Sequence, residues 1–322
     1  MRAISGWKAF SPLLPAAGAA PGGGPCPPVL RFAPSPNGLL HRGHAFSALL
    51  NRHLAHSWGG RFLLRIEDID VARCSDSLAA AAIEDLRWLG LDWCGEVRRQ
   101  SRHFADYAAA AMQLRAQGLL YQCYASRAEI AAAADGLHDP DGAPLRRRDI
   151  PVLTRREEER RELAGAPFAL RLDMRRALAV VAAHAEDLAF PALSETAAVE
   201  RRIAEPARWG DVVLVRKDVP ASYHLAVVVD DALQGITHVI RGRDLEAATD
   251  IHRLLQALLG LPVPVYHHHA LIQDEGGDKL AKSRGSLSLR ALRESGVRAA
   301  DLRAEFGLDR EGADTVEKDG TG

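Results

Sequence analysis

Apolar residues occur along this chain in short runs that alternate with longer stretches of helical spacing. Short runs are typical of buried strands, and the longer stretches predict helices. We expect strands at Val29–Phe32, Arg61–Ile66, Phe168–Leu172, Val212–Arg216 and Leu225–Val229. We expect helices at His41–Ser57, Ser75–Leu89, Phe104–Gln117 and Glu246–Leu259. Strands that alternate with helices predict an α/β fold with a parallel sheet.

The middle of the chain departs from this alternation. Residues 121–206 carry the basic run Arg146–Arg148 and a charged, helix-like stretch at Arg155–Arg161. We interpret them as an inserted mixed subdomain between two halves of one catalytic domain. By this division the halves are residues 29–120 and 207–307, residues 1–28 are a disordered extension, and residues 308–322 are a flexible tail.

Composition narrows the class of protein only slightly. The chain has 322 residues, 47% of them hydrophobic, and a formal net charge of -1. These values fit a globular protein without a global basic bias, so contacts with nucleic acid must come from local patches. Four scattered cysteines and the lack of a long apolar run favour a protein of the reducing cytoplasm.

Candidate chemistry begins where the first strand turns into the first helix. A turn at residues 34–38 leads to His41, Gly43 and His44 at the helix start. Unpaired N–H groups and the positive end of the helix dipole can hold a phosphate there, and two imidazoles on one face can donate to it. The alternative is a pair of surface histidines at an ordinary helix start.

A second cluster of candidate residues lies near the C-terminus, at Asp278–Arg284. Lys279 and Lys282 are cations that could follow the charge developing on a triphosphate, and Ser283 can hydrogen-bond to it. Glycines on both sides would allow the segment to close over a ligand. The alternative is a solvated, Lys-rich turn.

These two motifs, in this order and with the preceding Ala33–Gly38 stretch, resemble the signatures of class I aminoacyl-tRNA synthetases in their glutamate-specific form. The resemblance covers roughly residues 29–294 and is weakest at 123–206. It implies a Rossmann-like catalytic domain with an insertion, ATP as substrate and Mg²⁺. It also implies that His41, His44, Lys279 and Lys282 are catalytic, and that ATP is bound by His41, Gly43, His44, Lys282 and Ser283.

The same resemblance implies a pocket for glutamate. Glu67 would hold the ammonium group, and Arg241 would hold the side-chain carboxylate because a guanidinium binds a carboxylate bidentately. The other pocket residues implied are Arg31, Ser35 and Tyr223. The alternative for Glu67 is a strand-end carboxylate that pairs with Arg65.

Only forty residues follow Lys282, too few for an anticodon-reading helical domain. This points to a shorter branch of the family, which by resemblance activates glutamate without tRNA and transfers it to queuosine in the anticodon loop of tRNA(Asp). Three alternatives stay open. They are a truncated paralogue that charges another acceptor, a non-catalytic binding module, and another class of adenylyl transferase.

The insertion also departs from the family pattern at its metal site. Many members bind zinc there through a Cys-x-Cys pair and a further cysteine, whereas this chain reads Cys123-Tyr-Ala125 with no later cysteine. His138, Asp139 and Asp141 are poor substitutes, so we predict no zinc. We expect packing by Leu120, Tyr121, Ile130 and Leu137 to hold this region. The run His267–His269 should alternate along a strand, which makes a metal cluster there improbable.

Overall fold

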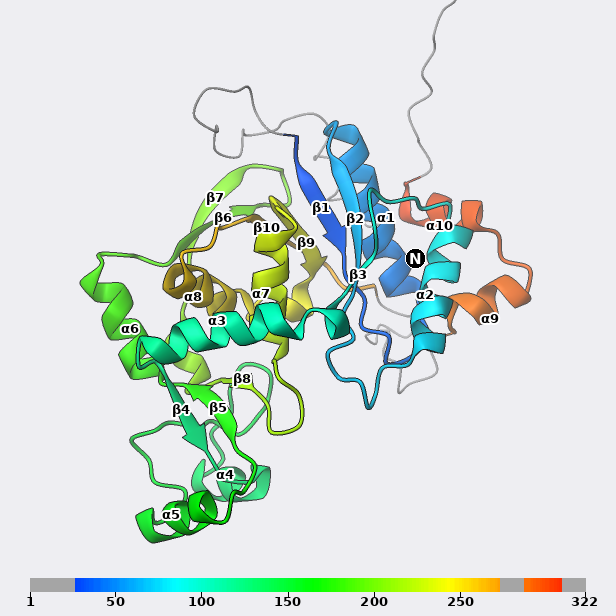
Figure 1. Cartoon of the computed structure of the whole chain (residues 1–322). Coiled ribbons are helices and arrows are strands. Elements are labelled where there is room, and N and C mark those ends of the chain that lie inside the picture. The colour runs from blue at the N-terminus through cyan, green and yellow to red at the C-terminus, as the bar shows by residue number, and fades with distance from the viewer. Residues whose placement is uncertain (1–26, 273–286, 309–322) are drawn as a thin grey trace, which may run out of the picture.

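The computed structural model describes residues 27–272 and 287–308, and the element bounds below refer to these (Figure 1). A parallel sheet of order β1-β2-β3 begins the fold, with β1 at Val29–Phe32, β2 at Arg61–Ile66 and β3 at Arg98–Arg99. A second sheet has the order β7-β6-β10-β9. Its strands are β6 (Ala189–Leu193), β7 (Val199–Ile203), β9 (His238–Gly242) and β10 (Val265–His269).

The two sheets adjoin where β1 meets β9. The Thr237 N–H donates to the Val29 carbonyl at 3.0 Å, and the Val29 N–H donates to the Thr237 hydroxyl at 2.8 Å. In the second sheet β6, β10 and β9 are parallel, and only β7 runs antiparallel to its neighbour β6. The carboxyl ends of β1, β2, β9 and β10 therefore lie along one edge, where parallel α/β sheets bind ligands.

Helices cover both faces of this sheet arrangement. One apolar core includes buried residues of α1 (Arg42–Ser57), α2 (Asp76–Trp88), α9 (Leu289–Glu294) and α10 (Ala299–Phe306). The other core includes those of α3 (Phe104–Ala116), α6 (Met174–Ala183), α7 (Tyr223–Leu233) and α8 (Thr249–Leu259). The three layers are those expected for an α/β domain. None of the described helices is both long and apolar enough to cross a bilayer.

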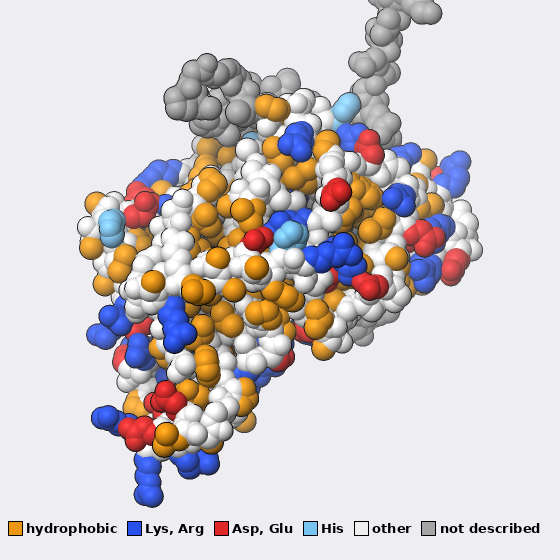
Figure 2. All heavy atoms as spheres, in the orientation of Figure 1, with side chains coloured by type: hydrophobic (Ala, Val, Ile, Leu, Met, Phe, Trp, Pro, Cys, Tyr) orange, Lys and Arg blue, Asp and Glu red, His pale blue; other side chains and the backbone are white. Residues whose placement is uncertain are grey.

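A third, antiparallel sheet has the order β4-β5-β8 and projects from this body (Figure 1). It consists of β4 (Leu120–Cys123), β5 (Ala169–Leu172) and β8 (Val213–Val215), with α4 (Arg127–Ala133) and α5 (Arg155–Leu163) at its tip. Strand β6, which precedes residue 206, pairs with β10 in the second sheet, whereas strand β8, which follows residue 206, pairs with β5 in the third sheet. On the face shown in Figure 2, Lys and Arg side chains are scattered, and several of them lie at this tip.

The expected strand at Leu225–Val229 is wrong, because these residues lie inside helix α7. Ser222 begins that helix, and its hydroxyl accepts from the Leu225 N–H at 3.4 Å. The helix packs against α3 and α8, so Leu225–Val229 are all buried. A short run that is buried on every side carries no periodicity by which a strand and a helix can be told apart.

Packing of the inserted region also differs in one residue from the expectation. Cys123, Ala125 and Ile130 form a small core, against which Tyr121 packs. Leu120 instead packs on the main core, and Leu137 is 56% exposed. The expected contribution of Leu137 to this core is therefore wrong. The β-turn-like segment after it is organised by polar contacts, with the Asp139 carboxylate accepting from the Ala143 N–H at 2.9 Å.

Candidate active site

A cavity of about 310 Å³ opens at the carboxyl edge of β1, β2, β9 and β10. Eight of the residues expected from the sequence line it together: Arg31, Ser35, His41, Gly43, His44, Glu67, Tyr223 and Arg241. They come from segments up to two hundred residues apart, and the sheet brings them to one place. The sequence did not single out Ser47, Asp244, Leu271 or Ile272, which also line the cavity.

Helix α1 begins at the two histidines of the first motif. The His41 Nδ1 accepts from the Gly43 N–H at 3.1 Å, and the His44 Nδ1 accepts from the His41 N–H at 3.2 Å. In a neutral imidazole only one nitrogen carries a proton, so these bonds assign the proton of each ring to Nε2. The rings lie 3.9 Å apart between centroids. The helix start thus presents two Nε2–H donors in addition to its backbone dipole.

Arg42, between the two histidines, points away from the cavity. Its guanidinium donates to the Glu305 carboxylate of α10 at 3.1 Å. Because the helix places residue 42 on a different side from residues 41 and 44, this arginine ties α1 to the C-terminal helix rather than to a ligand.

Glu67 follows β2 directly and lines the cavity, but it is also paired. The Arg65 Nη2 lies 3.1 Å from its carboxylate, which is the alternative contact expected from the sequence. Burial raises the pKa of the Glu67 carboxyl, while Arg65 and Arg31 offset part of that shift. An ammonium group bound in the cavity would add a further cation that favours the ionised carboxylate.

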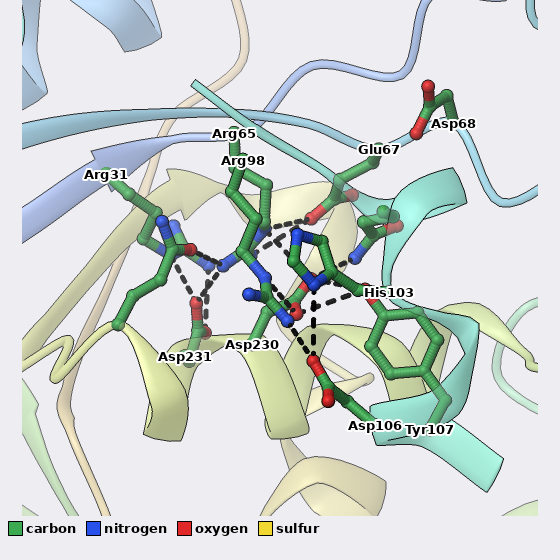
Figure 3. A network of polar contacts seen from close by, with 12 residues as sticks. Arg31, Arg65, Glu67, Asp68, Arg98, His103, Asp106, Tyr107, Asp230 and Asp231 are labelled. Carbon is green, nitrogen blue, oxygen red and sulfur yellow. Dashed lines mark hydrogen bonds and ion pairs between the residues drawn. The ribbon is translucent and has the colours of Figure 1, made fainter. Parts of the chain in front are cut away.

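Arg31 is held by Asp231, an acid of helix α7. Asp231, on α7, accepts from the Arg31 Nε at 3.0 Å and from the Arg65 Nη1 at 2.7 Å (Figure 3). Burial alone would raise the pKa of Asp231, but the two guanidinium groups outweigh it and lower that pKa. Asp231 therefore stays ionised and fixes Arg31 in the cavity wall together with the fully buried Arg65.

A second buried acid extends this network away from the cavity. Asp230 accepts from the Arg98 Nε at 2.6 Å, from the Gln100 side chain at 2.8 Å and from the Tyr107 hydroxyl at 2.9 Å (Figure 3). These residues belong to the β3 and α3 region, so the network ties α7 to the first sheet. Breaking such a buried network at one partner would leave an uncompensated charge.

Arg241 lies at the end of β9 and is only 5% exposed. Its guanidinium donates to the Tyr223 hydroxyl at 3.4 Å and to the Thr249 hydroxyl at 2.7 Å. No ion pair joins it to an acid within residues 27–272 and 287–308. A buried, uncompensated guanidinium beside a cavity is a site for an anionic group of a ligand.

The remaining expected residues are Ser35 and those of the second motif. The Ser35 hydroxyl lies 3.7 Å from the Cys74 sulfur at the rim of the cavity. Lys279, Lys282 and Ser283 lie outside the described residues. Their roles remain predictions from the sequence.

No group of three or more His, Cys, Asp or Glu side chains suited to a metal occurs in the described part of the chain. Cys123 is buried in the small core of the insertion, and Ala125 packs beside it. In β10 the His267 Nδ1 lies within hydrogen-bond distance of the Leu193 carbonyl oxygen, whereas the His268 Nε2 accepts from Arg241. The absence of zinc remains a prediction.

The chain matches the family model for the catalytic domain of class I tRNA synthetases (E and Q) over residues 29–310. The chain belongs to this family. It is a ligase of the aminoacyl-tRNA synthetase type with a glutamyl-tRNA synthetase-like catalytic domain, and ATP is a substrate of such enzymes. The family and the Rossmann-like α/β fold expected from the motifs are thereby confirmed.

The relatives include members of the shorter branch of the family. A protein of Rhodobacter capsulatus named glutamyl-Q tRNA(Asp) synthetase is 46% identical over 289 residues, which cover 87% of this synthetase and 100% of that relative. A protein of the same name from Symbiobacterium thermophilum is 41% identical. A protein of Paramagnetospirillum magneticum named glutamate–tRNA ligase 2 is 38% identical, but the match covers only 54% of it.

Solved structures show the same fold. A glutamate tRNA ligase of Elizabethkingia meningosepticum, in complex with its amino acid, matches with a TM-score of 0.63 and 25% identity. The match covers 84% of this synthetase and 53% of that ligase. A methionyl-tRNA synthetase of Mycobacterium tuberculosis matches with a TM-score of 0.55 at 14% identity, a likeness of fold alone.

Proposed function

We propose that this synthetase activates L-glutamate with ATP to glutamyl-adenylate without tRNA, and transfers the glutamyl group to queuosine in the anticodon loop of tRNA(Asp). The observation that supports the first step is that two charged groups line the same cavity. One is the Arg241 guanidinium, which has no acidic partner among the described residues, and the other is the Glu67 carboxylate. A ligand with an anionic side chain and an ammonium group satisfies both. The names of the relatives support tRNA(Asp) as the acceptor.

In the first step the α-carboxylate oxygen of glutamate attacks the α-phosphorus of ATP. A carboxyl–phosphate anhydride forms, the bond to the bridging oxygen breaks, and pyrophosphate leaves with that electron pair. The Nε2–H groups of His41 and His44 donate to phosphate oxygens on which charge increases. Lys279 and Lys282 would approach the same oxygens from the second motif.

Mg²⁺ enters this proposal as part of the nucleotide substrate, where it supplies neutralising charge between phosphate oxygens. The described residues hold no group of three or more acids, histidines or cysteines that would retain a metal. Glu67 and Asp244 are the carboxylates that line the cavity, and Glu67 is already paired with Arg65.

In the second step a nucleophile of queuosine attacks the carbonyl carbon of the adenylate, and AMP leaves. The acceptor must then reach the cavity from outside while the adenylate is held by Arg241 and the helix start of α1. A truncated paralogue with another acceptor would share the first step and differ only here.

ATP–pyrophosphate exchange measured across a panel of single amino acids tests the first step. We expect exchange with glutamate and Mg²⁺ in the absence of any RNA, because the cavity contains an acid for the ammonium group of glutamate and an arginine for its side-chain carboxylate. Exchange that appears only after tRNA is added would contradict tRNA-independent activation. Exchange with no amino acid of the panel, with or without RNA, would favour a non-catalytic binding module.

A further inference from the structure

The guanidinium of Arg241 is held entirely by neutral acceptors among the described residues. It donates to the Thr249 Oγ1 at 2.7 Å, to the His252 Nδ1 at 3.2 Å and to the His268 Nε2 at 3.3 Å. The guanidinium carbon also lies 5.5 Å from the centre of the Tyr266 ring. Arg31 and Arg65, by contrast, both pair with the Asp231 carboxylate. The cavity wall thus contains one arginine that is paired with an acid, Arg31, and one, Arg241, that has no acidic partner among the described residues.

The tautomers around Arg241 follow from these bonds. A guanidinium can only donate, so the His252 Nδ1 accepts and its proton lies on Nε2. The His252 Nε2 lies 3.4 Å from the Nδ1 of His224, which accepts in turn. On the other side the Thr249 hydroxyl accepts from Arg241 and lies 3.1 Å from the His268 Nε2, to which it can donate.

The rings around Arg241 are also kept uncharged. Thr249 is 1% exposed and His252 is 2% exposed, and both lie on α8, one turn apart. Burial first, and the nearby Arg241 charge second, lower the pKa of His268 to about 2 and that of His224 to about 4. The same two causes place the pKa of His252 well below its usual value. These histidines therefore remain neutral acceptors throughout the physiological pH range.

We propose that Thr249, His252 and His268 form a neutral cage that positions Arg241 while leaving its positive charge uncompensated for the side-chain carboxylate of the amino-acid substrate. The proposal rests on the proposed function and adds to it the residues that set the choice between a carboxylate and an amide. Thr249 and His252 are positioning residues, since they reach the substrate only through Arg241.

The cage is needed because orientation and charge have to be controlled separately. An acid in place of one acceptor would orient Arg241 equally well, as Asp231 does for Arg31, but it would neutralise the guanidinium. A carboxylate substrate would then lose most of its electrostatic advantage over the isosteric amide. Neutral acceptors orient the guanidinium without neutralising its charge.

The test compares His252→Glu with His252→Gln, which differ in charge and hardly in shape. Exchange assays would give the KM for glutamate, the KM for ATP and the ratio of kcat/KM for glutamate over glutamine. We expect His252→Gln to keep the ratio within about threefold of the unchanged protein, and His252→Glu to lower it by at least about tenfold through a higher glutamate KM. The KM for ATP should stay similar in both variants.

Equal glutamate-to-glutamine ratios in the two variants would overturn the cage. If the unchanged protein shows no glutamate-dependent exchange at all, the proposed function fails instead, so the two failures are distinct. Thermal melting checks that each variant is folded. If His252→Glu does not fold, Thr249→Val against Thr249→Ser provides a second pair. Valine removes an acceptor and should raise the glutamate KM by about fivefold or more, whereas serine should restore it.

Discussion

Alanine in place of Arg241 is expected to raise the KM for glutamate by about a hundredfold or more, because truncating one partner of a buried, charge-assisted pair costs about 2–5 kcal/mol. In the proposed function the guanidinium contacts the substrate side chain, which does not change during the reaction. The loss should therefore fall on binding, with a smaller change in kcat. Selection against glutamine should weaken at the same time, since the amide gains less from a guanidinium than the carboxylate does.

Arg243→Ala provides the matched control for this change. Arg243 is two residues further along the chain, lies on the surface and pairs with Glu195 at 3.3 Å. Its loss should leave glutamate KM and the preference over glutamine unchanged. If Arg241→Ala retained the full preference for glutamate, Arg241 would have to be removed from the amino-acid pocket, and Arg31 would become the better candidate.

Replacement of His44 by asparagine is expected to lower kcat of exchange by about 10²–10³, the usual loss for one preorganised donor to a transition state. The asparagine oxygen can take the place of the Nδ1 atom that accepts from the His41 N–H, so the helix start is preserved. The Nε2–H donor, however, is lost. The KM values for glutamate and ATP should change much less than kcat, because the donor acts mainly on charge that develops during the reaction.

His44→Gln is the corresponding control, since its longer side chain places an N–H donor near the position of Nε2. We expect it to recover part of the rate that His44→Asn loses. Equal, near-normal rates in both variants would mean that the first motif only starts helix α1.

The expected residues that the structure brings together in one cavity carry charged or polar groups that are costly to bury, and their roles stay predictions. Arg31, Glu67 and Arg241 follow or end parallel strands, and such positions converge at one sheet edge whatever the details of packing. His41 and His44 were found in the same way, because a turn between a strand and a helix defines the helix start. Their tautomers could not be predicted, since these depend on cap hydrogen bonds that only the fold reveals.

The expectations that failed concern burial and partners. The apolar run in α7 is buried on all sides, so the sequence contained no period by which to recognise a helix. Leu137 looked like a core residue but is exposed, because polar contacts organise the turn that follows it. Thr249 and His252 were missed since their partner, Arg241, is on another element. Only the fold shows that Asp231 fixes Arg31 and Arg65.

The central claim is tested most directly by the acceptance of labelled glutamate by purified tRNA(Asp) with and without queuosine, under conditions where exchange has been shown. The account predicts labelling of the queuosine-containing tRNA, and none of the same tRNA with guanosine at that position or of tRNA(Glu). The label should also be lost with Arg241→Ala at low glutamate concentration. Equal labelling of both forms of tRNA(Asp), or labelling of tRNA(Glu) alone, would contradict the proposed acceptor and favour a glutamyl-tRNA synthetase-like paralogue that charges another RNA.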